Sequence, residues 1–260
     1  MTKILAITNQ KGGVGKTTTS VNLAASLAAA RQRVLLIDLD PQGNATMGSG
    51  IDKRDLQSSV YEVLLGGKSI SAARIRAEAG KYDLLPANRE LAGAEIELVD
   101  LDRREMRLSD ALQPVSSEYA YVLIDCPPAL NLLTLNGLCA ARSVMIPMQC
   151  EYYALEGLSD LVNTIRKVRA NLNPDLEIEG LLRTMFDPRN ALAQQVSDQL
   201  LEHFGAKVYR TVIPRNVRLA EAPSFGVPVL YHDKLSKGTQ AYLALAGEFL
   251  NNAAYPAAPE

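Results

Sequence analysis

The sequence of 260 residues lacks tryptophan and is poor in aromatic residues of any kind, which make up 5% of the chain. Aromatic rings are the platforms on which proteins stack the bases of single-stranded nucleic acids, so their scarcity argues against base stacking as the main binding device. A large excess of charge is also missing, because the formal net charge is −2. Nucleic-acid-binding domains are usually basic overall, so any contact with DNA has to come from a local patch.

Cysteine is scarce as well, and the three examples, Cys126, Cys139 and Cys150, show no CxxC spacing. An odd number without close pairs fits a reducing compartment and indicates buried thiols. No apolar run approaches the ~20 residues of a membrane span, and the N-terminus has no apolar segment long enough for a signal peptide. We therefore expect a cytoplasmic protein that does not contact a membrane.

What is present is the composition of a globular protein, with 47% apolar and 22% charged residues. Short apolar runs alternate with helical patterns, beginning with a strand–loop–helix–strand unit. Runs that are apolar throughout suit parallel strands buried on both faces, so we predict an α/β fold with a doubly wound, mostly parallel sheet and helices on both faces. The expected strands are residues 4–8, 33–39, 82–86, 120–125, 143–148, 178–186 and 207–213, and the expected helices are residues 17–31, 91–112, 155–172, 192–204 and 237–251.

The least regular part is the segment 43–81, which we expect to be a surface excursion with a short helix around residues 60–65. The chain shows no internal repeat and no linker rich in Gly, Pro or Ser that would divide it. We therefore predict a single domain over residues 1–252. The tail, residues 253–260, contains two prolines and is predicted to be disordered.

A phosphate-binding loop follows the first expected strand. Gly15-Lys16-Thr17 matches the second half of the consensus G-x-x-x-x-G-K-[ST], whereas Gln10 stands at the first glycine position. The glycines allow backbone N–H groups to face an anion, and the helix that begins near Lys16 adds its partial positive charge. Lys16 offers an ammonium group to the phosphates and Thr17 a hydroxyl to Mg²⁺.

Lys11 places a second cation inside the same loop. A solvated loop lysine is the ordinary interpretation of such a residue. Two cations this close repel each other unless phosphate is near both, which favours a functional role. Charge alone leaves both interpretations open.

Four separated segments resemble the motifs of the ParA/MinD family of ATPases. Residues 11–18, Lys-Gly-Gly-Val-Gly-Lys-Thr-Thr, look like its deviant Walker A motif, and residues 38–44 look like its second motif. Residues 124–128 look like its Walker B motif, and residues 213–224 are similar to the base-binding and DNA-binding region of the chromosomal ParA (Soj) branch. The resemblance implies a P-loop NTPase fold, ATP and ADP with Mg²⁺ as ligands, and ATP hydrolysis.

The resemblance also implies roles for single residues. Lys11 reaches the nucleotide of a second subunit in an ATP-dependent homodimer, Lys16 holds the phosphates, and Asp40 positions the attacking water. Thr17, Asp40 and Asp125 serve the magnesium ion, and Asp38 is expected to help orient its shell. The implied nucleotide contacts are Lys11, Gly12, Gly13, Val14, Gly15, Lys16, Thr17, Thr18, Glu151, Met185, Phe186, Pro214, Arg215 and Asn216.

Ordinary structural roles compete with several of these. Asp40 and Asp125 are also typical of turns, Glu151 of a solvated surface, and Met185 and Phe186 of a core. A slow basal rate is expected, because no residue near the loop looks like a strong base.

The ParA branch binds double-stranded DNA without sequence preference and works with a centromere-binding ParB-type partner that stimulates hydrolysis, so we expect a nucleoid-associated protein. The chain starts almost directly at its first strand, which implies no N-terminal extension for reading an operator. Scattered solvated charges are the alternative to a DNA patch. The candidate DNA contacts are Arg189, Arg215, Arg218, Lys234 and Lys237.

Three other functions stay open. A membrane-cycling MinD-type regulator needs a basic amphipathic C-terminal helix, whereas this chain ends in residues 251–260 with no basic residue. An iron–sulfur electron carrier needs clustered cysteine thiolates, which the spacing does not provide. A ParA-like ATPase that positions another cargo is not distinguished by these motifs.

Overall fold

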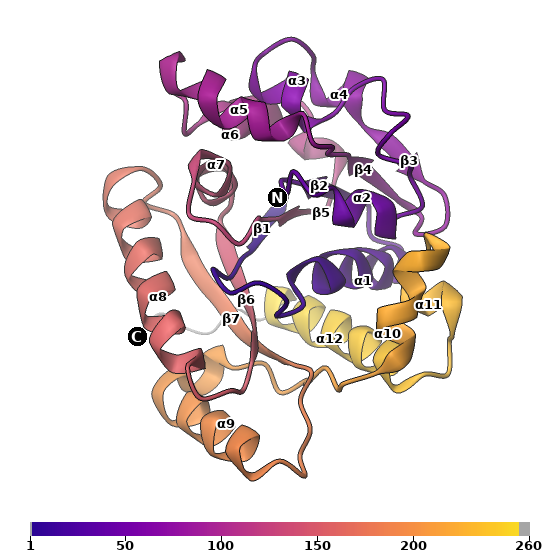
Figure 1. Ribbon diagram of the computed structural model, residues 1–260, viewed down its shortest axis with the longest axis vertical. Coiled ribbons are helices and arrows are strands. Elements are labelled where there is room, and N and C mark those ends of the chain that lie inside the picture. Colours follow the sequence, from indigo (N-terminus) through magenta and orange to yellow (C-terminus); the bar gives the residue numbers. More distant parts are fainter. Residues whose placement is uncertain (1, 255–260) are drawn as a thin grey trace.

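A seven-stranded sheet forms the centre of the computed structural model, which describes residues 2–254 (Figure 1). The strands follow the order β3-β4-β2-β5-β1-β6-β7. Neighbouring strands pair in parallel, except that β3 and β4 are antiparallel. The strands are β1 (Lys3–Ile7), β2 (Val34–Asp38), β3 (Ile75–Ala77), β4 (Tyr82–Leu85), β5 (Tyr121–Asp125), β6 (Ser143–Gln149) and β7 (Glu177–Thr184).

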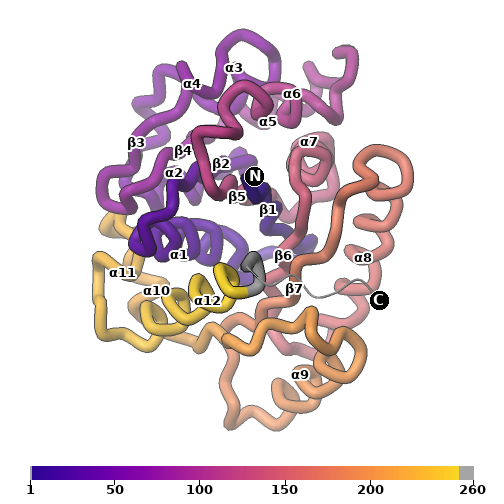
Figure 2. Tube along the Cα trace, turned by 180° about the vertical axis from the view of Figure 1, so that it is seen from behind, coloured from indigo at the N-terminus to yellow at the C-terminus, as the bar shows by residue number. Residues whose placement is uncertain are grey.

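Helices cover both faces of the sheet, as predicted. Alternate side chains of each strand belong to different cores, so that Leu35 of β2 packs on one face and Leu36 on the other. Figure 2 shows α1 and α12 side by side against one of these faces. That face carries α1 (Lys16–Ala29), α10 (Val217–Glu221), α11 (Val229–His232) and α12 (Lys237–Ala254), and the other carries α3 (Val60–Leu64), α5 (Leu91–Glu97), α6 (Arg107–Leu112), α7 (Leu132–Ala140), α8 (Ala154–Asn171) and α9 (Ala191–Phe204).

The register of the central strands brings the ends of three strands together. Ile7, the last residue of β1, lies opposite Asp125 of β5, and Asp38 of β2 lies opposite the same Asp125. The loops that follow these parallel strands therefore leave the sheet at one edge, where ligands of open α/β sheets bind.

The helix expected over residues 91–112 is divided, so this prediction was wrong in its extent. After α5 and one 3₁₀ turn the backbone becomes extended at Leu101 and left-handed at Arg103, and α6 begins at Arg107. The amide of Asn136 on α7 donates to the carbonyl of Arg104 at 2.8 Å and accepts from the N–H of Leu108 at 3.1 Å. A side chain from another helix thus occupies backbone groups that a continuous helix would pair internally.

The strand expected at residues 207–213 is absent. This stretch has one isolated bridge to β7, between Val208 and Leu181, and a second bridge joins Pro214, just after the stretch, to Phe186, just after β7; there is no continuous ladder. Between them, the carboxylate of Glu248 accepts two consecutive backbone N–H groups that a ladder would have used. The apolar pattern of the stretch reflects burial against α12 and β7 rather than strand pairing.

The segment 43–81 is more ordered than expected. It contains α2 (Asn44–Gly48), α3, α4 (Ile70–Ala73) and the edge strand β3. The short helix around residues 60–65 is confirmed as α3, which starts with a capping box between Ser59 and Glu62. Many apolar side chains of the segment are buried in the core, so it is not merely a surface excursion.

At the C-terminus, α12 continues to Ala254, two residues beyond the predicted end of the domain. Residues 255–260, the rest of the predicted tail, lie outside the described residues. Among the helices that are described, none combines the length and the apolar character needed to cross a membrane.

Candidate nucleotide-binding site

The phosphate loop joins β1 to α1 in a conformation that requires glycine. Gly13 and Gly15 have φ angles of 72° and 89°, in the left-handed region that side-chain-bearing residues rarely adopt. Between them Val14 is buried, and its carbonyl accepts a hydrogen bond of 2.7 Å from the Thr184 hydroxyl at the end of β7. The loop is therefore connected to the sheet through β1 and hydrogen-bonded to it at the end of β7.

A cavity of about 500 Å³ opens beside this loop. It is formed by segments that are far apart in the sequence and meet at the carboxyl edge of the sheet. The predicted residues on its wall are Gly12, Gly13, Gly15, Lys16, Thr17, Thr18, Asp40, Met185, Pro214, Arg215 and Asn216. Four other predicted nucleotide contacts, Lys11, Val14, Glu151 and Phe186, do not line it.

Lys16 is the cation of this cavity. It is 93% buried, and its Nζ donates to the carbonyl of Lys11 at 3.0 Å. Burial lowers the pKa of Lys16, while the charges of Asp125 and Asp40 act in the opposite direction. A buried ammonium group next to exposed backbone N–H groups favours an anion, which suits a nucleotide phosphate.

Lys11, in the same loop, does not line the cavity and pairs with an acid on the surface. Its Nζ forms an ion pair of 2.5 Å with Glu151, and both side chains are close to half exposed. The next residues, Tyr152 and Tyr153, are exposed aromatic rings that pack edge to face, with centroids 5.0 Å apart. The two lysines of the loop thus lie in different surroundings, Lys16 inside the cavity and Lys11 on the outer surface.

Asp125 lies behind Thr17 at the end of β5. Its two carboxylate oxygens accept from the hydroxyls of Thr17 and Ser20, each at 2.8 Å, and the residue is fully buried. Burial and, after it, the nearby charge of Asp38 together raise the pKa of Asp125 to about 8, although the hydrogen bonds from Thr17 and Ser20 oppose the shift. Asp125 therefore holds the Thr17 hydroxyl at the cavity wall.

These residues fit a magnesium ion bound together with phosphates. Thr17 and Asp40 present oxygen atoms at the cavity, and Mg²⁺ prefers one or two such protein ligands with phosphates and water completing its shell. Within the described residues there is no cluster of three His, Cys, Asp or Glu side chains that could hold a metal by itself. Magnesium would neutralise charge on the phosphates, held there by Thr17, Asp40 and, from behind, Asp125.

Asp38 is not among the residues that line the cavity, and its expected role at the magnesium shell stays a prediction. Its Oδ1 accepts from the N–H of Asp40 at 3.1 Å, and its Oδ2 accepts from both the N–H and the hydroxyl of Thr46 at 2.8 Å. Burial raises the pKa of Asp38 to about 6, although these hydrogen bonds oppose the shift. Asp38 fixes the loop that carries Asp40, and Asp40 itself lines the cavity.

Met185 and residues 214–216 also line the cavity. Met185 has a left-handed backbone, with φ of 48°, and its sulfur accepts from the Gln149 amide at 3.0 Å. Asn216 caps α10 through the N–H of Leu219. Phe186 instead packs on the core, with the guanidinium of Arg183 over its ring at 5.8 Å.

Several residues of the site escaped sequence reasoning. Ser20 contacts Asp125 one turn after the loop on α1, and its position three residues after Thr17 could have indicated this. Thr184 and Tyr242 also line the cavity, and the Tyr242 hydroxyl lies 3.1 Å from that of Thr19. No pattern in the chain connects these two residues to the phosphate loop.

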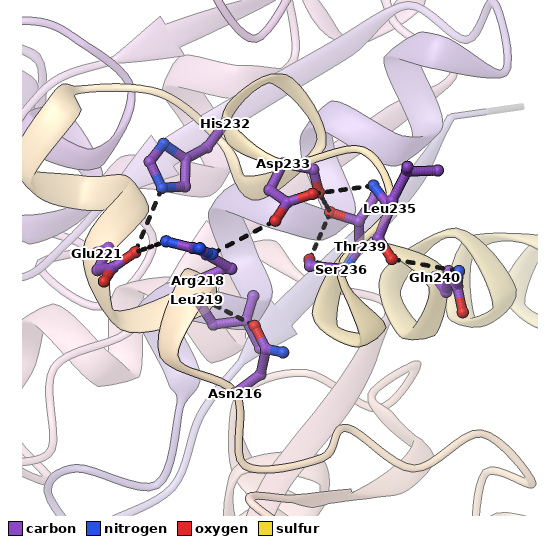
Figure 3. Close-up of polar contacts among 10 residues, drawn as sticks. All are labelled: Asn216, Arg218, Leu219, Glu221, His232, Asp233, Leu235, Ser236, Thr239 and Gln240. Carbon is purple, nitrogen blue, oxygen red and sulfur yellow. Dashed lines mark hydrogen bonds and ion pairs between the residues drawn. The ribbon is translucent and has the colours of Figure 1, made fainter.

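The five candidate DNA contacts do not form one patch of free cations. Arg189 is held by Asp187 in a two-pronged pair, at 2.9 and 2.8 Å. Arg218 on α10 lies between two acids (Figure 3), with Glu221 at 2.7 Å and Asp233 at 3.4 Å. The other three are exposed, Arg215 at the cavity and Lys234 and Lys237 near the start of α12.

The cysteines are buried free thiols, as predicted. Burial raises the pKa of Cys139 and Cys150 to about 11 and also raises that of Cys126. They provide no set of thiolates for an iron–sulfur cluster, so that alternative loses its chemical basis.

Comparison with known proteins agrees with this geometry. A family model described as an AAA domain matches residues 2–178. The chromosome partitioning protein ParA of Myxococcus xanthus (strain DK1622) is 54% identical over 248 residues, which cover 95% of this chain and 88% of that protein. The sporulation initiation inhibitor protein Soj of Bacillus subtilis (strain 168) is 56% identical over 252 residues, which cover 97% of this chain and 100% of that protein.

Among solved structures, cobyrinic acid a,c-diamide synthase from Mycobacterium smegmatis with bound ADP and magnesium matches with a TM-score of 0.86 and 40% identity. The match covers 98% of this chain and 96% of that chain. The same assignment follows from the sequence motifs, the fold, the cavity and the relatives of similar length. The chain belongs to the ParA/Soj family of P-loop ATPases.

Proposed function

We propose that this chain is an ATP-driven switch that partitions chromosomes or plasmids. It binds ATP with Mg²⁺ in the cavity, forms a homodimer around two nucleotides, and in that state binds double-stranded DNA without sequence preference. Hydrolysis to ADP ends the dimeric state, and a ParB-type partner stimulates it. The relatives named for chromosome partitioning and the neighbour that binds ADP and magnesium support this proposal.

One observation supports the proposed dimer. The cavity already contains a lysine, Lys16, whereas Lys11 of the same loop points out of it toward Glu151 on the outer surface. The phosphate site of its own subunit does not use Lys11. This cation is therefore suited to contact the phosphates bound in a second subunit. There it would neutralise charge that develops on the transferred phosphoryl group.

The chemistry of hydrolysis requires little from the protein beyond positioning. Lys16 and the backbone N–H groups of the loop hold the phosphates, and Thr17 holds magnesium. Asp40, fixed from behind by Asp38, orients the attacking water. Because this arrangement lacks the second cation until a dimer forms, the isolated chain should turn over slowly.

DNA binding is proposed for the ATP-bound dimer. Lys234, Lys237 and Arg215 are exposed cations on the C-terminal part of the chain, and Arg218 joins them when it leaves its acidic partners. Two copies double the patch, which compensates for a net charge of −2. Nucleoid association follows from this binding.

The test is the oligomeric state by size-exclusion chromatography with light scattering, in ATP and in ADP. We expect wild type to dimerise only with ATP, Asp40→Ala to form a longer-lived ATP dimer, and Lys11→Ala to stay monomeric. Lys207→Ala, an exposed lysine after α9, is the matched control and should behave as wild type. Equal dimerisation in ADP, or a normal ATP dimer of Lys11→Ala, would contradict the proposal.

A further inference from the structure

We call the part of the cavity lined by residues 214–216, where the family resemblance implies that the base is held, its base end. The chain that leads to it runs beside β7 with unequal spacing. The carbonyl of Leu181 accepts from the N–H of Tyr209 at 3.0 Å, and the carbonyl of Arg183 accepts from the N–H of Ile213 at 2.9 Å. The acceptors are two positions apart in the sequence, whereas the donors are four positions apart. A regular parallel ladder advances equally on both strands, so two extra residues are looped out here.

The carbonyls of this excursion are held by Arg183, which points from β7 toward them. Its Nη2 donates to the carbonyls of Tyr209 at 2.9 Å and Arg210 at 3.3 Å, and its Nη1 donates to the hydroxyl of Ser197 on α9 at 2.9 Å. Arg183 is 92% buried, and burial lowers its pKa, although the charge of Glu248 opposes this. The buried guanidinium of Arg183 thus provides donors for backbone carbonyls that a regular ladder would have paired.

The N–H groups of the excursion are held from the other side by Glu248 of α12. Its Oε1 accepts from Arg210 at 2.7 Å and its Oε2 from Thr211 at 2.9 Å. Hydrogen bonds with one charged partner are shorter and stronger than neutral ones. Arg183 and Glu248 therefore fix the length and shape of the excursion with four bonds to backbone atoms.

The excursion determines which residues reach the cavity. The chain rejoins β7 at Pro214, which bridges to Phe186, and Pro214, Arg215 and Asn216 then line the cavity. Each residue of a strand spans about 3.3 Å, so a change of one residue in the excursion would displace this wall by that distance. Neither Arg183 nor Glu248 lines the cavity.

We propose that Arg183 and Glu248 are positioning residues for the base end of the nucleotide site. They act through the backbone of residues 209–211 and set where residues 214–216 lie, without touching the nucleotide. The inference rests on the nucleotide binding proposed above. It predicts that their loss weakens recognition of the base while phosphate binding at the loop, formed by β1 and α1, is preserved.

The test compares two ligands by displacement of a fluorescent ADP analogue, in the presence of magnesium. ADP contacts both ends of the cavity, whereas inorganic tripolyphosphate has no base. For Glu248→Ala we expect ADP to bind about tenfold more weakly and tripolyphosphate to bind within about twofold of wild type. Glu248→Gln should lie between wild type and Glu248→Ala, because its amide keeps one acceptor oxygen. Arg183→Lys should weaken ADP alone, because one ammonium cannot reproduce the guanidinium fork.

Glu202→Gln, an exposed acid of α9, is the control and should leave both affinities unchanged. Unchanged ADP affinity in Glu248→Ala would overturn the inference, and so would an equal loss for both ligands, which indicates a general structural role. If Glu248→Ala does not fold, Glu248→Gln decides by the same comparison. Failure of wild type to bind either ligand would refute the proposed function instead.

Discussion

The ion pairs of Arg218 lead to a quantitative prediction about DNA binding. Arg218 is 52% exposed, and Glu221 and Asp233, which flank it, are each more than a third exposed. A guanidinium in this position has to leave its acids before it contacts a phosphate. Removing the acid and removing the arginine should therefore change DNA affinity in opposite directions.

The salt dependence gives the magnitude. Each phosphate of duplex DNA that is neutralised contributes about 0.9 to the slope of log affinity against log salt. Loss of Arg218 from both subunits should lower the slope by about 1.8, so the affinity loss between 50 and 200 mM salt becomes about twelvefold smaller. Glu221→Gln should instead strengthen binding by about twofold to 25-fold, as expected for release from one exposed ion pair in each of the two subunits.

The assay is fluorescence anisotropy of a labelled duplex with the ATP-bound protein at several KCl concentrations. Arg218→Gln and Glu221→Gln are compared with Arg103→Gln, which removes an arginine from a similar exposed pair with Asp110. The control should match wild type. An unchanged slope in Arg218→Gln, or weaker binding in Glu221→Gln, would refute the assignment of Arg218 to the DNA surface.

Three further predictions concern the phosphate loop. Gly15→Ala should lower the free energy of unfolding by about 1–2 kcal/mol, measured by urea denaturation, because φ is 89° there. Thr184→Val should cost about 1–3 kcal/mol in the same assay, because the buried Val14 carbonyl loses its donor; an unchanged midpoint would contradict this. Thr17→Val should reduce the dependence of nucleotide affinity on magnesium, measured by calorimetry with and without EDTA, and an unchanged dependence would contradict this.

The sequence allowed prediction of those parts of the site whose chemistry is local. The order strand, glycine loop and helix is set by neighbouring residues, so the loop around Lys16 and the parallel unit behind it are confirmed. The family resemblance predicted nucleotide contacts at residues 214–216, and these residues line the cavity.

Other parts depend on contacts between distant segments, which no local pattern reports. The helix over residues 91–112 is divided by the side chain of Asn136, and the strand at residues 207–213 is replaced by contacts with Glu248. Thr184 reaches the loop only because β7 and β1 flank the same strand, β6. The pairing of Arg218 with its acids is likewise invisible in a count of charges.

The contact between Lys11 and Glu151 has a consequence for the protein concentration at which the switch operates. In the proposed symmetric dimer both subunits would use the same surface, so both pairs would break together when each lysine moves to the opposite nucleotide. An exposed pair shifts an equilibrium by up to about fivefold, and two such pairs by up to about 25-fold. If the proposed dimer forms in this way, the pair raises the protein concentration at which ATP assembles it.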